Sequence, residues 1–142
     1  AKALGEALHR WRAGDLRAQP QDPSLVTHAP MLRKQDGCVL WSKAADEIAR
    51  AVRAFDPWPG AFFQLDGAIV KLWATEPLPT SAPTDEAPGT VLDLAASGVV
   101  VQTGHGRLLL REVQAAGKRR MSASDWARGT RLKVGTRLDV IA

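Results

Sequence analysis

The sequence contains no tyrosine, a single cysteine, two methionines and three histidines among its 142 residues. One cysteine cannot form a disulfide within the chain, and we expect Cys38 to pack as a small apolar side chain. No apolar run approaches the roughly twenty residues that a membrane helix needs, and the first residues lack the apolar core of a signal peptide. Together with the scarcity of cysteine, these absences favour a cytoplasmic protein that does not contact a membrane.

Residue patterns typical of enzyme active sites are also lacking. His9, His28 and His105 lie far apart in the sequence and form no recognised zinc-ligand pattern, so we predict no metal site. The chain has no glycine-rich phosphate loop and no nucleophile elbow. His105 stands between two glycines, where a solvated turn residue is a simpler interpretation than a catalytic one. We therefore expect no catalytic residue and no cofactor site in this chain.

Charge is distributed unevenly along the chain. Residues 1–103 contain ten Lys/Arg and twelve Asp/Glu, whereas residues 104–142 contain nine Lys/Arg and three Asp/Glu. The formal net charge of +4 therefore arises from the C-terminal part of the sequence. Such asymmetry suggests a polyanionic partner, with nucleic acid as the first candidate.

The first residues are predicted to form one amphipathic helix and a linker. Apolar side chains with helical spacing predict a helix over residues 3–13, and its stripe consists of Leu4, Ala7, Leu8 and Trp11. Residues 15–30 contain three prolines and little periodicity, as is typical of a linker. We place a boundary here, with residues 1–26 as a detached helix and linker and residues 27–142 as one domain. Without a surface to cover it, the stripe is expected to contact a neighbouring chain or to be poorly ordered.

The domain is predicted to begin with a helix and a tight hairpin. Residues 45–55 have an apolar stripe at helical spacing, Ser42 is the expected N-cap, and Pro57 and Pro59 end the helix. Asp66-Gly67 then predicts a two-residue hairpin turn, because both positions tolerate positive φ.

The rest of the domain is predicted to be mostly β-structure. Residues 76–89 contain four prolines and are expected to form an exposed loop. A capping-box-like start at Ser122 predicts a short helix that ends at Gly129. The predicted strands after the loop are residues 90–95, 98–103, 107–113 and an extended segment over 132–141. About six short strands without βα alternation favour a mainly β fold, a small antiparallel barrel with one longer and one short helix.

A cluster of cations is the main functional signal. Basic side chains that are predicted to contact RNA phosphates are Lys118, Arg119, Arg120, Arg131 and Lys133, with Lys43 and Lys71 as secondary candidates. The alternative is that these charges only form a solvated face. Trp41, Trp58 and Trp73 are expected in the core. Trp126 is also expected to pack, with stacking on RNA as the alternative.

An ordered set of short motifs resembles a known family. The segments are His28–Leu32, Trp41–Ser42, Phe55–Phe62, Lys71–Trp73, Ala87–Val91 and Gly117–Trp126. Their order and content resemble the C-terminal domain of bacterial methionyl-tRNA formyltransferase over residues 27–138. Leu40 and Asp56 depart from residues that are frequent in that family. Neither departure touches the cationic cluster.

The resemblance implies an OB-like barrel that holds initiator tRNA. The family's N-terminal catalytic domain binds 10-formyltetrahydrofolate and carries an Asn-His-Asp set that has no counterpart here. The resemblance thus implies that this chain alone catalyses nothing, and that residues 1–26 join it to that catalytic domain. Two alternatives remain open. In the first, the chain resembles the C-terminal lobe of a related formyltransferase or formyltetrahydrofolate hydrolase. In the second, the barrel is a purely structural interdomain module without RNA binding.

Overall fold

The computed structural model describes residues 2–79 and 85–139, and it divides the chain into two units, Ala1–Met31 and Leu32–Ala142. The first unit contains helix α1 (Lys2–Arg12), as the apolar spacing predicted, and the short 3-10 helix η1 (Pro23–Leu25). The apolar stripe of α1 is exposed: Leu4, Leu8 and Trp11 retain 65%, 56% and 70% of their accessible surface. The helix therefore has no core of its own among the described residues.

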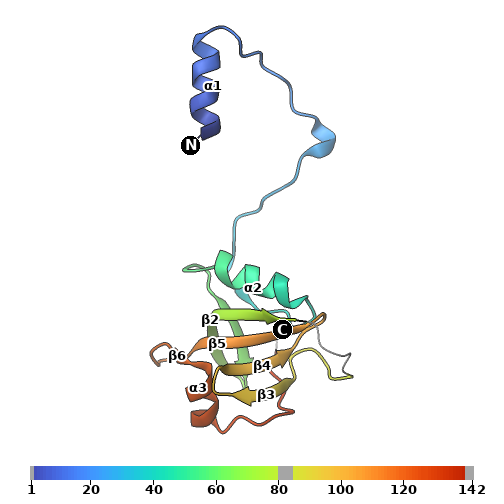
Figure 1. The fold of residues 1–142 in the computed structure, drawn as a ribbon, viewed down its shortest axis with the longest axis vertical. Helices are drawn as coiled ribbons and strands as arrows, with labels where there is room; N and C mark the ends of the chain where they lie inside the picture. Colours follow the sequence, from blue (N-terminus) through green and yellow to red (C-terminus); the bar gives the residue numbers. More distant parts are fainter. Residues whose placement is uncertain (1, 80–84, 140–142) are drawn as a thin grey trace. The chain divides into compact units, whose positions relative to one another are not determined.

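The second unit is a six-stranded antiparallel sheet with two α-helices and one short 3-10 helix (Figure 1). Its strands are β1 (Ala61–Leu65), β2 (Ala68–Leu78), β3 (Val91–Ala95), β4 (Gly98–Gln102), β5 (Arg107–Ala115) and β6 (Met121–Ser122). The order in the sheet is β1-β2-β5-β4-β3, and β6 pairs with the free part of β5. Its helices are the 3-10 helix η2 (Lys34–Gly37), α2 (Ala45–Ala54), which packs on β2, and α3 (Ala123–Thr130), which packs on β5 and β4. The prediction of a mainly antiparallel β fold is confirmed.

The hairpin of β1 and β2 turns at the predicted residues. Asp66 and Gly67 both have positive φ, 50° and 77°, as a two-residue hairpin turn requires. Strand β2 continues to Leu78, so the first part of the predicted loop at residues 76–89 is strand instead. Beyond Leu72 this strand no longer pairs with β1, and Pro77 is tolerated there as it is on an edge strand. Residues 80–84 of the predicted loop lie outside the described residues.

The predicted barrel is not confirmed, because the sheet is not closed within the described residues. The expected last strand is an irregular segment, of which residues 132–139 are described. This segment forms isolated antiparallel bridges between Asp139 and Gln64 of β1 and between Arg137 and Thr90, which precedes β3. Single-residue bridges thus connect the two outer strands of the sheet where a continuous ladder was expected.

Three aromatic rings form the centre of the core. The ring centroid of Phe63, which is fully buried, lies 5.6 Å from that of Trp41 and 5.8 Å from that of Trp126, both in edge-to-face geometry. The core positions predicted for Trp41 and Trp126 are confirmed. The alternative that Trp126 stacks on RNA is wrong, because only 2% of its surface is exposed. Trp58 was expected in the core but is 58% exposed, since it lies in the turn between α2 and β1.

Helix α2 covers this core with its predicted apolar stripe. Its buried residues are Ala45, Ile48, Ala49 and Val52. The predicted N-cap was wrong: Ala44 occupies that position without a side-chain hydrogen bond. Ser42 instead belongs to a turn in which Gly104 N–H donates to the Trp41 carbonyl over 2.8 Å. A contact distant in sequence therefore displaced a local capping preference.

Candidate nucleic-acid interface

The most basic exposed segment is the basic loop, which we define as Gly117–Arg120 between β5 and β6. All four residues are exposed, and the Lys118 N–H donates to the Ala115 carbonyl over 3.0 Å. The loop follows directly from β5, whose position in the middle of the sheet is fixed by β2 and β4. Its cations are thus presented from a rigid element.

Two hydrogen bonds connect the basic loop to the outer face of the sheet. The Trp73 Nε1–H donates to Gln114 Oε1 over 3.1 Å, and Gln114 Nε2 donates to the Lys118 carbonyl over 2.8 Å. Trp73 is half-buried on β2, not in the core as predicted. Its indole group instead orients the glutamine amide that holds the loop backbone.

Arg120 is also held against the sheet. Its guanidinium carbon lies 4.0 Å from the centroid of the Trp73 ring, close enough for a cation–π interaction. Its Nη1 lies 3.6 Å from Glu112 Oε2 on β5. Lys71 Nζ lies 5.6 Å from the centroid of the same ring. Arg120 thus has partners within the protein, which distinguishes it from its two neighbours in the loop.

Lys118 and Arg119 have no such partners. Across residues 2–79 and 85–139, no carboxylate lies within salt-bridge distance of either cation. An exposed cation without a carboxylate partner has its full charge available to a phosphate. These two side chains are therefore exposed cations without a carboxylate partner among the described residues, as are Arg131 and Lys133 of the predicted set.

The remaining predicted cations lie elsewhere on the domain. Arg131 is the C-cap of α3 in the left-handed conformation, with φ 53° and ψ 37°, and Lys133 follows it. The basic loop lies close to the N-terminal end of α3, and a helix of this length spans roughly 12 Å. The structure thus places Arg131 and Lys133 at the opposite end of α3 from the basic loop. The secondary candidate Lys43 forms an ion pair with Glu47.

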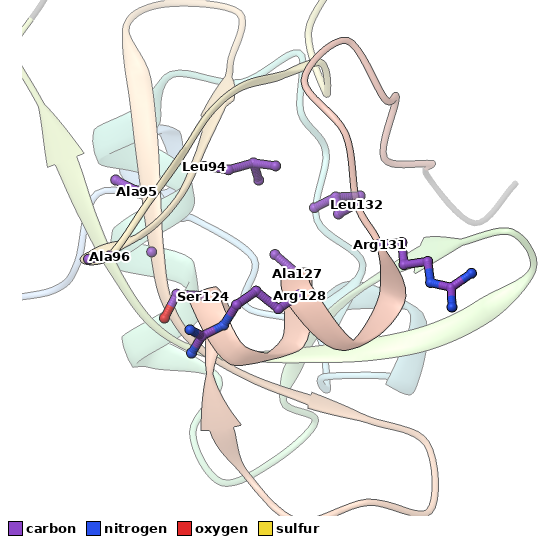
Figure 2. A pocket seen from close by; sticks show the side chains of 9 residues that line it. Leu94, Ala95, Ala96, Ser124, Ala127, Arg128, Arg131 and Leu132 are labelled. Atoms are coloured by element: carbon purple, nitrogen blue, oxygen red, sulfur yellow. The ribbon is translucent and has the colours of Figure 1, made fainter.

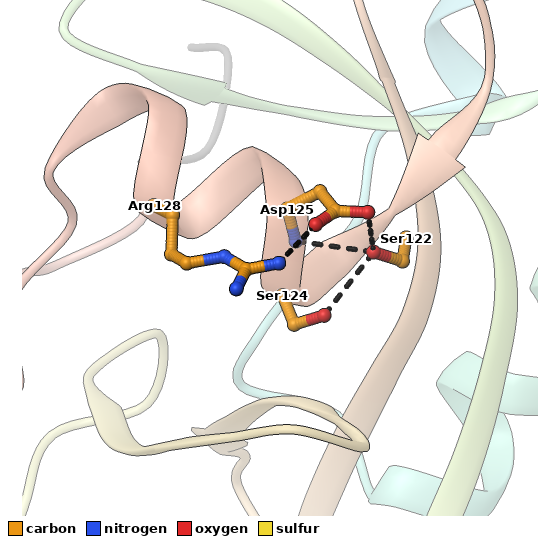
Figure 3. Close-up of polar contacts among 4 residues, drawn as sticks. All are labelled: Ser122, Ser124, Asp125 and Arg128. Atoms are coloured by element: carbon orange, nitrogen blue, oxygen red, sulfur yellow. Dashed lines mark hydrogen bonds and ion pairs between the residues drawn. The ribbon is translucent and has the colours of Figure 1, made fainter.

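The start of α3 shows the predicted capping arrangement (Figure 3). The Asp125 N–H donates to Ser122 Oγ over 3.1 Å, and that hydroxyl donates to Asp125 Oδ2 over 2.6 Å. Asp125 also forms an ion pair with Arg128. The hydroxyl of Ser122, and secondarily Arg128, lower the pKa of the Asp125 carboxyl from its ordinary value. Arg128 is consequently paired with a carboxylate of its own helix.

Two hollows lie on the surface of the domain, one beside α3 and one beside the basic loop. The first hollow, of about 600 Å³, lies between α3 and the turn that joins β3 to β4, and Leu94, Ala127 and Leu132 form its apolar walls (Figure 2). Figure 2 shows the Arg131 guanidinium directed away from Leu94 and Leu132. The second hollow, of about 420 Å³, lies beside the basic loop and shares Gly117 with it; Gln114, which donates to the loop backbone, also lines this hollow.

Neither a membrane span nor a metal cluster is found in the described part of the chain. There, no helix is long and apolar enough to cross a bilayer. Likewise, no three His, Cys, Asp or Glu side chains are placed to hold a metal ion within residues 2–79 and 85–139.

Comparison with known proteins identifies the family. The profile of the formyl transferase C-terminal domain matches residues 31–131, which is most of the chain. The chain belongs to this family. The expected resemblance to the C-terminal domain of methionyl-tRNA formyltransferase is thereby confirmed.

Curated relatives of this formyl transferase C-terminal domain are longer than this chain and carry the name methionyl-tRNA formyltransferase. Methionyl-tRNA formyltransferase from Burkholderia vietnamiensis is 44% identical over 138 residues, and the enzyme of that name from Desulforamulus reducens is 39% identical over 136 residues. Each match covers 96% of this chain and 42% or 43% of the relative. The chain thus spans about two fifths of the length of these relatives.

A solved structure shares the fold of this formyl transferase C-terminal domain. HypX from Aquifex aeolicus, in complex with tetrahydrofolic acid, has a TM-score of 0.59 and 22% identity. The match covers 94% of this chain and 23% of HypX. At this identity the likeness concerns the fold alone.

Sequence reasoning found the cations of the basic loop but missed what holds them. Trp73, Gln114 and Glu112 lie on β2 and β5, and the partners Trp73 and Gln114 are 41 residues apart. Alternation along β2 indicates only that Lys71 and Trp73 share a face. Their relation to the loop depends on the pairing of Lys71 with Gln114 across the two strands.

Proposed function

We propose that this chain is the tRNA-positioning C-terminal lobe of a methionyl-tRNA formyltransferase. In this proposal the lobe binds initiator tRNA in the cytoplasm, and a separate N-terminal catalytic domain formylates the methionyl group for translation initiation. That catalytic domain binds the formyl donor, 10-formyltetrahydrofolate. The observation that carries the proposal is an exposed basic loop in a member of this family, with Lys118 and Arg119 free of carboxylate partners among the described residues.

The physical basis is contact with phosphates. Lys118 and Arg119 each neutralise one phosphate and release the counterion bound to it, so that binding weakens as salt increases. Such contacts position the RNA without reading its bases. Arg131 and Lys133 add positive charge at the far end of α3, which extends the contact along a folded RNA that is recognised by its shape.

The proposal also assigns roles to the two parts of the chain. Residues 1–26 are the last helix and the linker of the catalytic domain, and the exposed stripe of α1 packs on that domain. Residues 27–142 are the tRNA-binding lobe, an OB-like variant of the antiparallel sheet. The lobe itself holds neither donor nor metal and has no catalytic residue.

A second candidate function is compatible with the fold shared with HypX, which was solved with tetrahydrofolic acid. In that case the chain is the lobe of a related formyltransferase or formyltetrahydrofolate hydrolase that acts on a small substrate, and the sheet has no RNA duty. If the chain is instead a purely structural interdomain module, it is likewise expected not to bind RNA. The basic loop would then be a solvated surface.

Titration of the chain with initiator tRNA at several salt concentrations tests the proposal. The variant is Lys118→Ala/Arg119→Ala, and the matched control is Arg50→Ala/Arg53→Ala, which removes two exposed cations of α2. We expect the slope of log affinity against log salt to fall by roughly 1.5 in the variant and to stay unchanged in the control. Absence of binding at low salt, or equal slopes for variant and control, would favour the second candidate.

A further inference from the structure

The second hollow lies on the outer face of the sheet. Its lining comes from η2, β1, β2, β5, the turn before β1 and the turn that leads from β5 into the basic loop. It consists of Lys34, Pro59, Phe62, Ile69, Lys71, Gln114, Ala115, Ala116 and Gly117. Pairing in the sheet explains why these residues meet: Phe62 is opposite Lys71, and Lys71 is opposite Gln114. The three side chains therefore form one row across β1, β2 and β5.

This hollow combines apolar walls with positive charge. Ile69 is 37% exposed, and Phe62 presents the remaining 8% of its surface. The charged groups of the lining are Lys34 and Lys71, and the lining among described residues contains no carboxylate. The site thus suits a group that is apolar and planar on one side and negatively charged on the other.

The first hollow lacks this combination. Arg128, on its rim, is paired with Asp125, and the Arg131 guanidinium is directed away from the walls. Charge complementarity to an anion is therefore concentrated in the second hollow, although the first hollow is larger.

We propose that the second hollow binds one unstacked nucleotide of an RNA. The base packs against Ile69 and the exposed edge of Phe62, and Lys34 and Lys71 contact its phosphate. This inference rests on the proposed function, because the RNA is the one held by the basic loop. Gly117 belongs to both sites, so that the neighbouring phosphates reach Lys118 and Arg119.

The physical reason is that an unpaired base has an apolar face to bury, whereas a paired base is already stacked. Packing of unstacked bases on protein side chains is the usual way in which RNA loops and bulges are recognised. The lobe would then distinguish an irregular RNA from a continuous duplex, which phosphate contacts alone do not achieve.

The probes are two RNA hairpins with the same number of nucleotides. One carries a single bulged 2-aminopurine, and the other carries 2-aminopurine within a paired stem. We expect the chain to bind the bulged hairpin at least about fivefold more tightly and to change its fluorescence. Ile69→Ala and Lys71→Ala should each reduce the ratio of the two affinities toward one. Thermal melts should show that both variants remain folded.

Leu94→Ala is the matched control. Leu94 is also 37% exposed, but it lines the first hollow, so this variant should keep the preference for the bulged hairpin. Equal, salt-dependent binding of both hairpins would overturn the nucleotide site and leave the phosphate contacts intact. A preference that survives Ile69→Ala and Lys71→Ala would also overturn it. Binding of tRNA without binding of either hairpin would likewise overturn the nucleotide site. Absence of binding to any RNA would overturn both the nucleotide site and the proposed function.

Discussion

The guanidinium of Arg120 lies over the indole ring of Trp73, with 4.0 Å between the guanidinium carbon and the ring centroid. Trp73 also holds Gln114, which holds the backbone of Lys118. One aromatic side chain therefore fixes both ends of the three-residue cationic run. The three cations are equivalent in the sequence but differ in the structure: Arg120 is held against the sheet, whereas Lys118 and Arg119 are exposed and have no carboxylate partner among the described residues.

Removal of the Trp73 ring should loosen the basic loop. Trp73→Ala deletes the cation–π contact and the hydrogen bond to Gln114, which together stabilise the loop by about 1 to 2 kcal/mol. We expect hydrogen exchange of the Lys118 amide, which donates to the Ala115 carbonyl, to accelerate about tenfold. Trp58→Ala is the control, since Trp58 is 58% exposed and should leave this amide unchanged. Equal exchange in the two variants would contradict the anchoring role.

Truncation of the central ring should strongly destabilise the domain. Phe63 is fully buried between Trp41 and Trp126, so Phe63→Ala leaves a cavity and should cost about 3 to 5 kcal/mol of unfolding free energy. Urea unfolding measures the change. Val134→Ala, at a residue with 60% exposure, should change the same quantity by less than about 0.5 kcal/mol. A small loss for Phe63→Ala would show that the aromatic cluster is not the centre of the core.

Replacement of two glycines by alanine should change the stability of the domain in opposite directions. At Gly98, with φ 144°, an added Cβ would lie 2.0 Å from the Leu110 carbonyl oxygen, so Gly98→Ala must displace β4 from β5 and should cost more than about 2 kcal/mol. At Gly129, within α3, an added Cβ meets no atom within 4 Å. Gly129→Ala should therefore stabilise the domain, by up to about 1 kcal/mol. Thermal melts of both variants measure the change in melting temperature. A change of the same sign in both variants would contradict this prediction.

The cap of α3 should weaken in acid. The pKa of Asp125 in the folded chain is lowered, chiefly by the Ser122 hydroxyl and then by Arg128. A carboxyl with a lowered pKa stabilises the fold above its ordinary pKa of 3.8 and loses this contribution as pH falls through the folded value. Asp125→Asn should therefore lower the melting temperature at pH 7 and have progressively less effect below about pH 4. If the melting temperatures of the unchanged chain and of Asp125→Asn differ by the same amount at every pH, the ionised carboxylate is not the source of the difference.

Features set by a few neighbouring residues were predictable. The Asp66-Gly67 turn, the Ser122 cap and helix α1 depend on local backbone preferences, and the structure contains all three. The core position expected for Trp58 was wrong, because this residue lies between two prolines in the turn that precedes β1, where 58% of its surface is exposed.

Features set by strand pairing were not predictable. The extension of β2 to Leu78 depends on β5, which begins almost thirty residues later, and the roles of Trp73 and Arg120 depend on the same pairing. The pattern of cations located the basic loop. It gave no information on the second hollow, because Lys34, Ile69 and Gln114 meet only when η2, β2 and β5 are assembled.

The bridging segment at residues 132–139 has a consequence for solubility. It makes backbone hydrogen bonds to both outer strands, from Asp139 to Gln64 and from Gly135 to Val91. An uncovered outer strand is a template for pairing with another molecule, which leads to aggregation. Here a single irregular stretch shields both margins of the sheet at once. Detaching this segment would leave the outer edges of β1 and β3 free at once, so its loss should favour pairing with other molecules at two edges of the sheet.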